Sequence, residues 1–207
     1  MQDFDQTKSE LQAFLREKSV FHGDFTLSSG AKSSFYIDCK LTTLHPKGAW
    51  LVGQVMHYII RKQQEALGVA VDGVGGLTMG ADPIALAVAM VSHWANDPSP
   101  LSSFSVRKTP KSHGQTKLIE GNFHKGDSVV VLDDVVTQGE STLKAIDAVL
   151  QEGGTVAFVA MLVDREEGGR TKIEVRGFPV IAAFTREEIL GSGARIRQAA
   201  KRRCVKA

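Results

Sequence analysis

The chain has 207 residues, a formal net charge of +2 and 43% hydrophobic residues. This length fits one large domain or two small ones, and the near-neutral charge gives no strong case for a nucleic-acid or membrane partner. Cys39 and Cys204 are far apart and stand in no metal-ligand or redox spacing, which argues against a disulfide framework. The N-terminus lacks the apolar stretch of a signal peptide, and no window approaches the ~20 apolar residues that span a bilayer. We therefore expect a cytoplasmic protein.

Four stretches have the apolar spacing of helices: 7–18, 46–67, 82–95 and 143–150. Thr7 and Glu10 have capping-box spacing at the start of the first one. Pro46 suits the start of the second, and Gly68 is a plausible stop at its end.

Strands are expected between these helices. Residues 25–40 read as a hairpin that turns at Gly30, and short apolar runs follow at 69–74, 104–106, 129–132, 156–163 and 180–184. Strands that alternate with helices predict an α/β fold with a mainly parallel sheet flanked by helices. No linker is visible, so we expect a single domain over 1–207, with an N-terminal extension that covers the sheet.

The segment 129–142, VVVLDDVVTQGEST, has the strongest chemical signature. An apolar strand leads into Asp133 and Asp134, which we expect at an exposed strand tip, and Thr137 and Gly139 precede a helix. Backbone N–H groups at a helix N-terminus suit a phosphate, whereas carboxylates suit sugar hydroxyls. A ribose 5-phosphate satisfies both requirements, although the acids could instead merely cap the next helix. No Walker loop or dinucleotide fingerprint is present.

This segment resembles the phosphoribosyl pyrophosphate (PRPP) motif of type I phosphoribosyltransferases. The resemblance implies that the whole run contacts PRPP: Asp133, Asp134, Val135, Val136, Thr137, Gln138, Gly139, Glu140 and Ser141. Gln138 and Glu140 stand where the family often has small residues. A carboxylate next to a phosphate is unfavourable, so we expect Glu140 to point to solvent.

Residues 106–121, VRKTPKSHGQTKLIEG, are rich in cations and poor in apolar residues, which is typical of a mobile loop. From charge alone, an ordinary solvated loop is the alternative. The spacing of Arg107, Lys108, Lys111 and His113 is similar to the catalytic loop of orotate phosphoribosyltransferases. The resemblance implies that these cations bind the pyrophosphate of PRPP. It makes Lys111 and His113 catalytic together with the two acids.

Three further segments carry the same resemblance. Residues 25–38 are similar to the family's N-terminal signature, which places Tyr36 and its neighbours beside the pyrimidine, and Arg165 and Thr137 are the other implied orotate contacts. Without the family, the hairpin aromatics read equally well as core and Arg165 as a surface ion pair. Residues 73–83 resemble the pyrophosphate-side loop. Ser28 and Met79 stand where some members carry lysine.

The resemblance implies a homodimeric enzyme with shared active sites. Its N-terminal extension forms a hood, and it transfers ribose 5-phosphate from PRPP to orotate in pyrimidine biosynthesis. Mg²⁺ is the implied cofactor and is held mainly through PRPP, because hard cations prefer such oxygens. Two alternatives stay open at this point: a phosphoribosyltransferase for another base, such as a purine, and a non-catalytic PRPP-sensing regulator. The orotate-type signatures and the Lys/His loop argue against both.

Overall fold

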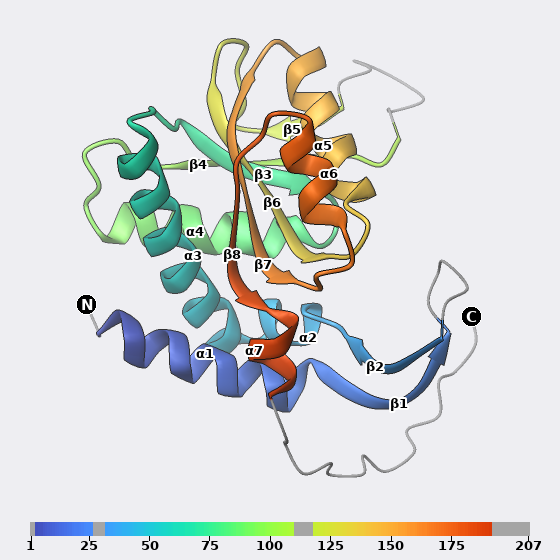
Figure 1. Ribbon diagram of the computed structural model, residues 1–207. Helices are drawn as coiled ribbons and strands as arrows, with labels where there is room; N and C mark the ends of the chain where they lie inside the picture. The colour runs from blue at the N-terminus through green and yellow to red at the C-terminus, as the bar shows by residue number, and fades with distance from the viewer. Residues whose placement is uncertain (1–2, 27–31, 110–117, 192–207) are drawn as a thin grey trace.

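The computed structural model describes residues 3–26, 32–109 and 118–191 and has one large sheet at its centre (Figure 1). Its six described strands lie in the order β5-β4-β3-β6-β7-β8. They are β3 (Gly73–Leu77), β4 (Ser102–Val106), β5 (Ile119–Gly121), β6 (Ser128–Val136), β7 (Thr155–Asp164) and β8 (Val180–Thr185). Only β5 runs antiparallel to its neighbour, so the expected mainly parallel sheet is confirmed.

Helices pack on both faces of this sheet, because its central strands are apolar on both sides. Alternate residues of β6 face opposite layers: Val130 and Leu132 join one buried cluster, and Val129 and Val131 join the other. The first cluster is closed by α3 (Pro46–Leu67) and α4 (Ala81–Trp94), the second by α5 (Glu140–Gln151) and α6 (Gly169–Val175).

The N-terminal part forms a separate layer at the carboxyl ends of the parallel strands (Figure 1). It comprises α1 (Phe4–Lys18), the antiparallel hairpin of β1 (Val20–Thr26) and β2 (Lys32–Ile37), and α2 (Lys40–Thr43). The C-terminal α7 (Arg186–Leu190) lies against α1, and Arg16 of α1 donates hydrogen bonds to the carbonyls of Glu188 and Ile189. The expected hood-like extension is therefore present, although the hairpin turn around Gly30 lies outside the described residues.

Two local expectations are wrong. The first helix begins at Phe4 and is capped by Asp3, while Thr7 lies inside it and donates to the Asp3 carbonyl at 3.0 Å. The strand expected at 69–74 is β3 and runs through Gly73–Leu77, so Gly75 and Gly76 lie within a strand. A Cβ on Gly76 would stand 2.1 Å from the Leu132 carbonyl oxygen, because neighbouring backbones approach closely there. In the described part of the chain, no helix is long and apolar enough to cross a membrane.

Candidate active site

The acid pair lies inside β6, which continues to Val136. Asp133 accepts hydrogen bonds from the Thr142 hydroxyl at 2.6 Å and from the backbone N–H of Asp134 at 3.0 Å. It is only 8% exposed, so the expectation of an exposed strand tip is wrong for this residue. Burial raises the pKa of Asp133 to about 7; the neighbouring Asp134 adds to the rise and the Thr142 hydrogen bond opposes it. The buried carboxylate is therefore more stable when it is protonated, or when a polar ligand donates hydrogen bonds to it, than when it is ionised and alone.

Asp134 faces the glycine loop that follows β3. An added Cβ on Gly80 would stand 2.4 Å from Asp134 Oδ1, so only glycine fits beside this carboxylate without a shift. The Val135 N–H donates to the same oxygen at 3.0 Å. Burial raises the pKa of Asp134, and the positive charge of Lys40 is the strongest opposing influence.

The turn 137–141 leads from β6 into α5. Gly139 has a φ of 78°, and Gly169 donates its N–H to the Thr137 carbonyl at 2.9 Å. An added Cβ on Gly169 would stand 2.5 Å from that carbonyl oxygen, so the turn is packed against the start of α6. No side chain caps the N-terminus of α5. Its first N–H groups are thus suited to an anion.

The side chain of Gln138, in this turn, is held by two hydrogen bonds to residues outside it. Gln138 donates to the Glu167 carbonyl at 2.7 Å and accepts from Lys172 at 2.7 Å. Glu140 is exposed, which agrees with the expectation that it points to solvent. The loop can therefore present its backbone without placing a carboxylate on the phosphate.

Arg165 follows β7 and is buried against the hairpin. Its guanidinium lies 4.8 Å from the Phe35 ring centroid and pairs with Glu167 at 2.8 Å. Its buried Nε has no hydrogen-bond partner among the described residues. Tyr36, next to Phe35 on the strand, is 40% exposed, and its ring lies 5.7 Å from Phe25. A planar cation with an unused donor beside aromatic rings suits a planar ligand with carbonyl oxygens.

The cationic loop is described only at its ends. Arg107 donates its backbone N–H to the Leu118 carbonyl and pairs with Glu120 at 3.4 Å, while Lys108 is exposed. The buried Nε of Arg107 has no hydrogen-bond partner in the described part of the chain. Lys111 and His113 lie outside the described residues, as does Ser28.

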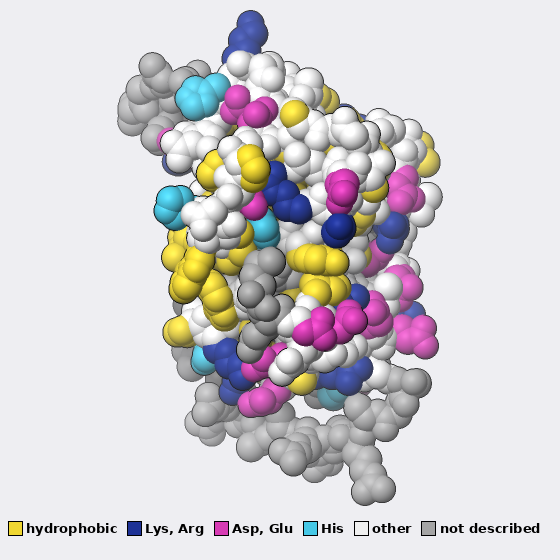
Figure 2. Space-filling model, turned by 90° about the vertical axis from the view of Figure 1, so that its left-hand side faces the viewer, with side chains coloured by type: hydrophobic (Ala, Val, Ile, Leu, Met, Phe, Trp, Pro, Cys, Tyr) yellow, Lys and Arg dark blue, Asp and Glu magenta, His cyan; other side chains and the backbone are white. Residues whose placement is uncertain are grey.

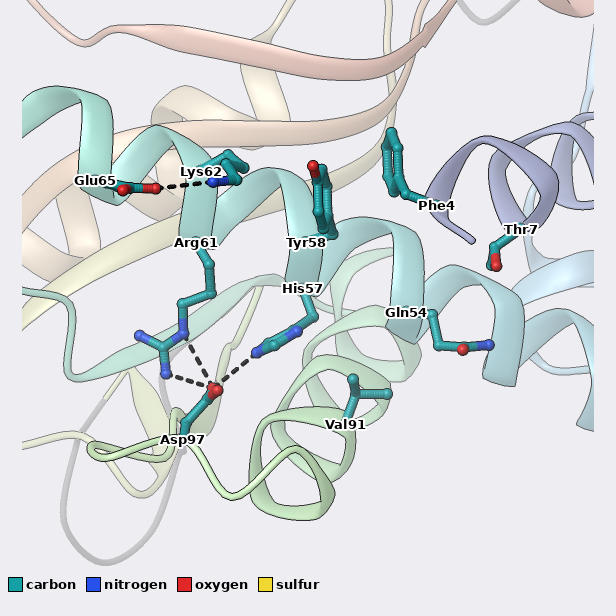
Figure 3. A pocket seen from close by; sticks show the side chains of 10 residues that line it. All are labelled: Phe4, Thr7, Gln54, His57, Tyr58, Arg61, Lys62, Glu65, Val91 and Asp97. Carbon is teal, nitrogen blue, oxygen red and sulfur yellow. Dashed lines mark hydrogen bonds and ion pairs between the residues drawn. The ribbon is translucent and has the colours of Figure 1, made fainter. Parts of the chain in front are cut away.

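A pocket of about 330 Å³ lies elsewhere, between α1, α3 and the end of α4 (Figure 3). Its charged groups are paired with one another: Asp97 Oδ2 lies 2.7 Å from both His57 Nε2 and Arg61 Nη2. Lys62 pairs with Glu65 at 3.0 Å. This network of paired charges joins α3 to the loop after α4. We therefore interpret these charged residues as holding the two segments together and not as binding a ligand.

The sequence singled out the segments 25–38, 73–83 and 129–142, which contain Phe35, Gly80 and Thr142, but not the individual contacts of these three residues. Lys40 lies outside those segments and was not predicted as a site residue. Among the described residues, no cluster of three or more His, Cys, Asp or Glu side chains is arranged to hold a metal ion.

Three features of this chain are typical of type I phosphoribosyltransferases. They are the mainly parallel sheet with paired acids on a central strand, the uncapped helix N-terminus that follows them, and the N-terminal hood. Solved structures agree. The chain is similar to an orotate phosphoribosyltransferase of Mycobacterium tuberculosis in complex with Fe(III) dicitrate, with a TM-score of 0.74, 36% identity and coverage of 88% of this chain and 98% of that one. The structure from the same organism in complex with PRPP has a TM-score of 0.69 and 30% identity, and covers 89% and 92%.

Sequence comparison narrows the class to one family. An orotate phosphoribosyltransferase of Aquifex aeolicus is 42% identical over 186 residues, which are 88% of this chain and 97% of that protein. A comparison with models of protein families finds no match. At this identity and coverage, the chain belongs to the orotate phosphoribosyltransferase family.

Proposed function

We propose that the chain catalyses its family's reaction, the transfer of ribose 5-phosphate from PRPP to orotate in pyrimidine biosynthesis. The products are orotidine 5-phosphate and pyrophosphate. The observation that carries this proposal is the position of Asp133 and Asp134, on the central strand immediately before the open N-terminus of α5.

The 5-phosphate of PRPP is assigned to the turn 137–141. The N–H groups at the start of α5 supply donors, and the helix dipole favours the negative charge. The fixed contact between Thr137 and Gly169 keeps the backbone of this turn in place.

Asp133 and Asp134 are assigned to the ribose. Their carboxylates accept hydrogen bonds from the 2- and 3-hydroxyls. As the bond between ribose C1 and the pyrophosphate oxygen breaks, its electron pair leaves with pyrophosphate and the sugar becomes positive. The carboxylates of Asp133, which is buried, and Asp134, which is half-buried, stabilise that charge electrostatically. Orotate N1 then forms the new bond, and its acidic ring proton is lost without a strong general base.

Arg165, Tyr36 and Thr137 are assigned to orotate, with Phe35 as a fourth contact. The unused Nε–H of Arg165 provides a donor for a carbonyl edge of the pyrimidine. The ring of Phe35 orders the guanidinium by stacking on it.

Arg107, Lys108, Lys111 and His113 are assigned to pyrophosphate. Several cations are needed because negative charge grows on the leaving group. Closure of this loop would exclude water, which otherwise hydrolyses PRPP.

Mg²⁺ is assigned to the same site, held mainly through PRPP. The residues present fit such an ion, because two adjacent carboxylates with raised pKa values offer hard oxygens that a divalent cation would favour in their ionised form. When bound, Mg²⁺ would neutralise the charge of pyrophosphate.

The chain is assigned a single-domain fold and a homodimeric state with shared active sites. Leu86, Met90 and Trp94 recur every four residues on α4 and are 57%, 63% and 72% exposed. Trp50 of α3 extends this stripe, with its ring centroid 5.2 Å from that of Trp94. Figure 2 views the side of the molecule on which α3 lies and shows hydrophobic side chains gathered there. A stripe of this kind favours burial against a second copy.

The proposal is tested by incubating the protein with PRPP, Mg²⁺ and a panel of free bases. We expect loss of orotate absorbance that depends on Mg²⁺, with no comparable consumption of adenine, hypoxanthine or uracil. Efficient use of a purine with orotate inert would refute the assignment. Binding of PRPP without turnover of any base would point to a regulator.

A further inference from the structure

We propose that Lys40, at the start of α2, is a further pyrophosphate-binding residue and supplies positive charge that the glycine loop of this chain lacks. This inference rests on the proposed function. It concerns a residue that the sequence pattern did not single out, on an element outside the PRPP motif.

The Lys40 ammonium is held in place by Asp38 but has N–H donors that Asp38 does not use. Its ammonium lies 2.7 Å from Asp38 Oδ1, which also accepts the Lys40 backbone N–H at 3.1 Å. Asp38 is in turn fixed by its own N–H, which donates to the Ser19 carbonyl at 2.8 Å. An ammonium has three donors, and the Lys40 side chain is 41% exposed. The lysine is therefore oriented, and its remaining donors are available to a ligand.

Lys40 begins α2, which lies in the layer at the carboxyl ends of the parallel strands, and β6 carries the acid pair close to that end (Figure 1). Asp38 raises the pKa of Lys40 through their hydrogen bond, and Asp134 and Tyr36 raise it further by their charges. Burial raises the pKa of the neighbouring Cys39 thiol, and Asp134, Asp38 and Asp133 add to that rise. Lys40 thus stands close to a residue assigned to the ribose and to one assigned to the pyrimidine.

The glycine loop 73–83, which resembles the pyrophosphate-side loop, contains no lysine or arginine. Gly80 of the glycine loop abuts the Asp134 carboxylate, and the positive charge of Lys40 acts on the same carboxylate. The loop itself offers Met79, which is 63% exposed and uncharged. A pyrophosphate that leaves ribose C1 along this loop would pass within the field of Lys40. Orotate, with its own carboxylate, is the competing anion that the test must separate.

The test measures ligand binding by calorimetry for Lys40→Met, Lys40→Arg and the matched control Lys47→Met. Lys47 also pairs with a carboxylate, Glu10 at 2.6 Å, and its side chain is 53% exposed. The probes are inorganic pyrophosphate with Mg²⁺, PRPP with Mg²⁺, ribose 5-phosphate and orotate. We expect Lys40→Met to weaken pyrophosphate and PRPP by about tenfold to a hundredfold, as for a hydrogen bond to a charged group. Ribose 5-phosphate and orotate should bind as before. Lys40→Arg should recover most of the loss, and Lys47→Met should show none.

Unchanged pyrophosphate binding in Lys40→Met, or a loss confined to orotate, would overturn the proposal. If the unpaired Asp38 lowers the melting temperature of Lys40→Met, the double variant Asp38→Asn/Lys40→Met removes that charge and the binding comparison is made there. The pyrophosphate measurement needs no turnover. A wild-type protein that binds pyrophosphate through Lys40 but ignores orotate would therefore contradict the proposed function alone.

Discussion

At the scale of single residues, the environment of Asp133 links catalysis to stability. Its pKa is raised to about 7, mainly by burial. A raised folded-state pKa means that the group contributes stability below its unfolded value, near 4. That contribution is lost as pH rises through about 7. The ionised form that the sugar hydroxyls require is thus the form that destabilises the fold.

Asp133→Asn should therefore separate the two effects. We expect turnover to fall by about 10²–10³, by analogy with the loss of one preorganised group. The melting temperature, measured from pH 5 to pH 8, should decline less steeply in the variant than in wild type. A variant that unfolds at every pH would instead indicate a structural role for the carboxylate.

Arg165→Lys tests the pyrimidine assignment at the same scale. The change keeps the charge that faces Glu167 but removes the planar, multi-donor group that lies over Phe35. We expect the KM for orotate to rise by roughly tenfold or more, the range for losing a charged hydrogen bond, with the KM for PRPP little changed. Equal increases in both constants would show a general disturbance of the site.

At the scale of elements, Asp97 fastens the loop after α4 to α3. Burial alone would raise the pKa of Asp97, but hydrogen bonds from Ser92, His57 and Arg61 outweigh it and hold the pKa below its ordinary value. A lowered folded-state pKa gives stability that is present above the unfolded value and lost as pH falls through the folded one.

Asp97→Asn should lower the free energy of unfolding at pH 7 by about 1–3 kcal/mol, because the amide keeps one acceptor oxygen but removes the negative charge that His57 and Arg61 share. Urea unfolding at several pH values measures this. The difference from wild type should shrink as pH falls below about 4, because the carboxylate of the unfolded wild-type chain then binds protons before that of the folded chain. Orotate turnover by the folded variant should be close to wild type, since the pocket in Figure 3 lies apart from the acid pair.

Local sequence could predict the elements that have strong end signals. The helix expected at 46–67 has those bounds in the structure, with Pro46 in its first turn and Gly68 in the left-handed conformation after it. The bounds of β3 were not predicted correctly, because its glycines are required by the close approach of the neighbouring strands. That requirement is a tertiary contact, which a local sequence pattern does not show. β5, with 3 residues, and α2, with 4, are too short to show a period.

The residues of the candidate site likewise fall into those that local sequence predicts and those that depend on tertiary contacts. The acid pair and Thr137 could be predicted as site residues because the motif that contains them is one uninterrupted stretch of sequence. The contact of Phe35 with Arg165 and the charge influence of Lys40 on Asp134 could not be predicted, because both join residues that are distant in sequence.

At the scale of the whole molecule, the exposed stripe on α4 predicts how two copies meet. Met90→Glu places a charge in the middle of Leu86, Met90 and Trp94, and burial of an unpaired charge is unfavourable. We expect the variant to elute as a monomer in size-exclusion chromatography with light scattering, with an unchanged circular dichroism spectrum and reduced turnover. A dimer of unchanged strength would place the interface elsewhere. Glu152→Lys, on the loop after α5, is the surface control.

If the active sites are shared, two inactive variants should complement each other. Lys111→Ala damages the cationic loop, and Asp133→Asn damages the ribose site, each at a cost of about 10²–10³ in rate. If Lys111 serves the neighbouring subunit, a mixed dimer contains one site with both lesions and one with neither. Random exchange makes half of the dimers mixed, so activity should return to about a quarter of wild type in a symmetric dimer.

An active site formed within one subunit gives a different result in this experiment. If Lys111 serves its own subunit, every site of a mixed dimer carries one lesion and no activity returns. Native mass spectrometry must confirm that mixed dimers have formed before either result is read. Mixed dimers without recovered activity would rule out sharing through Lys111. They would leave the orotate reaction untouched, because that reaction requires the loop to reach the acid pair but not that it come from the other chain.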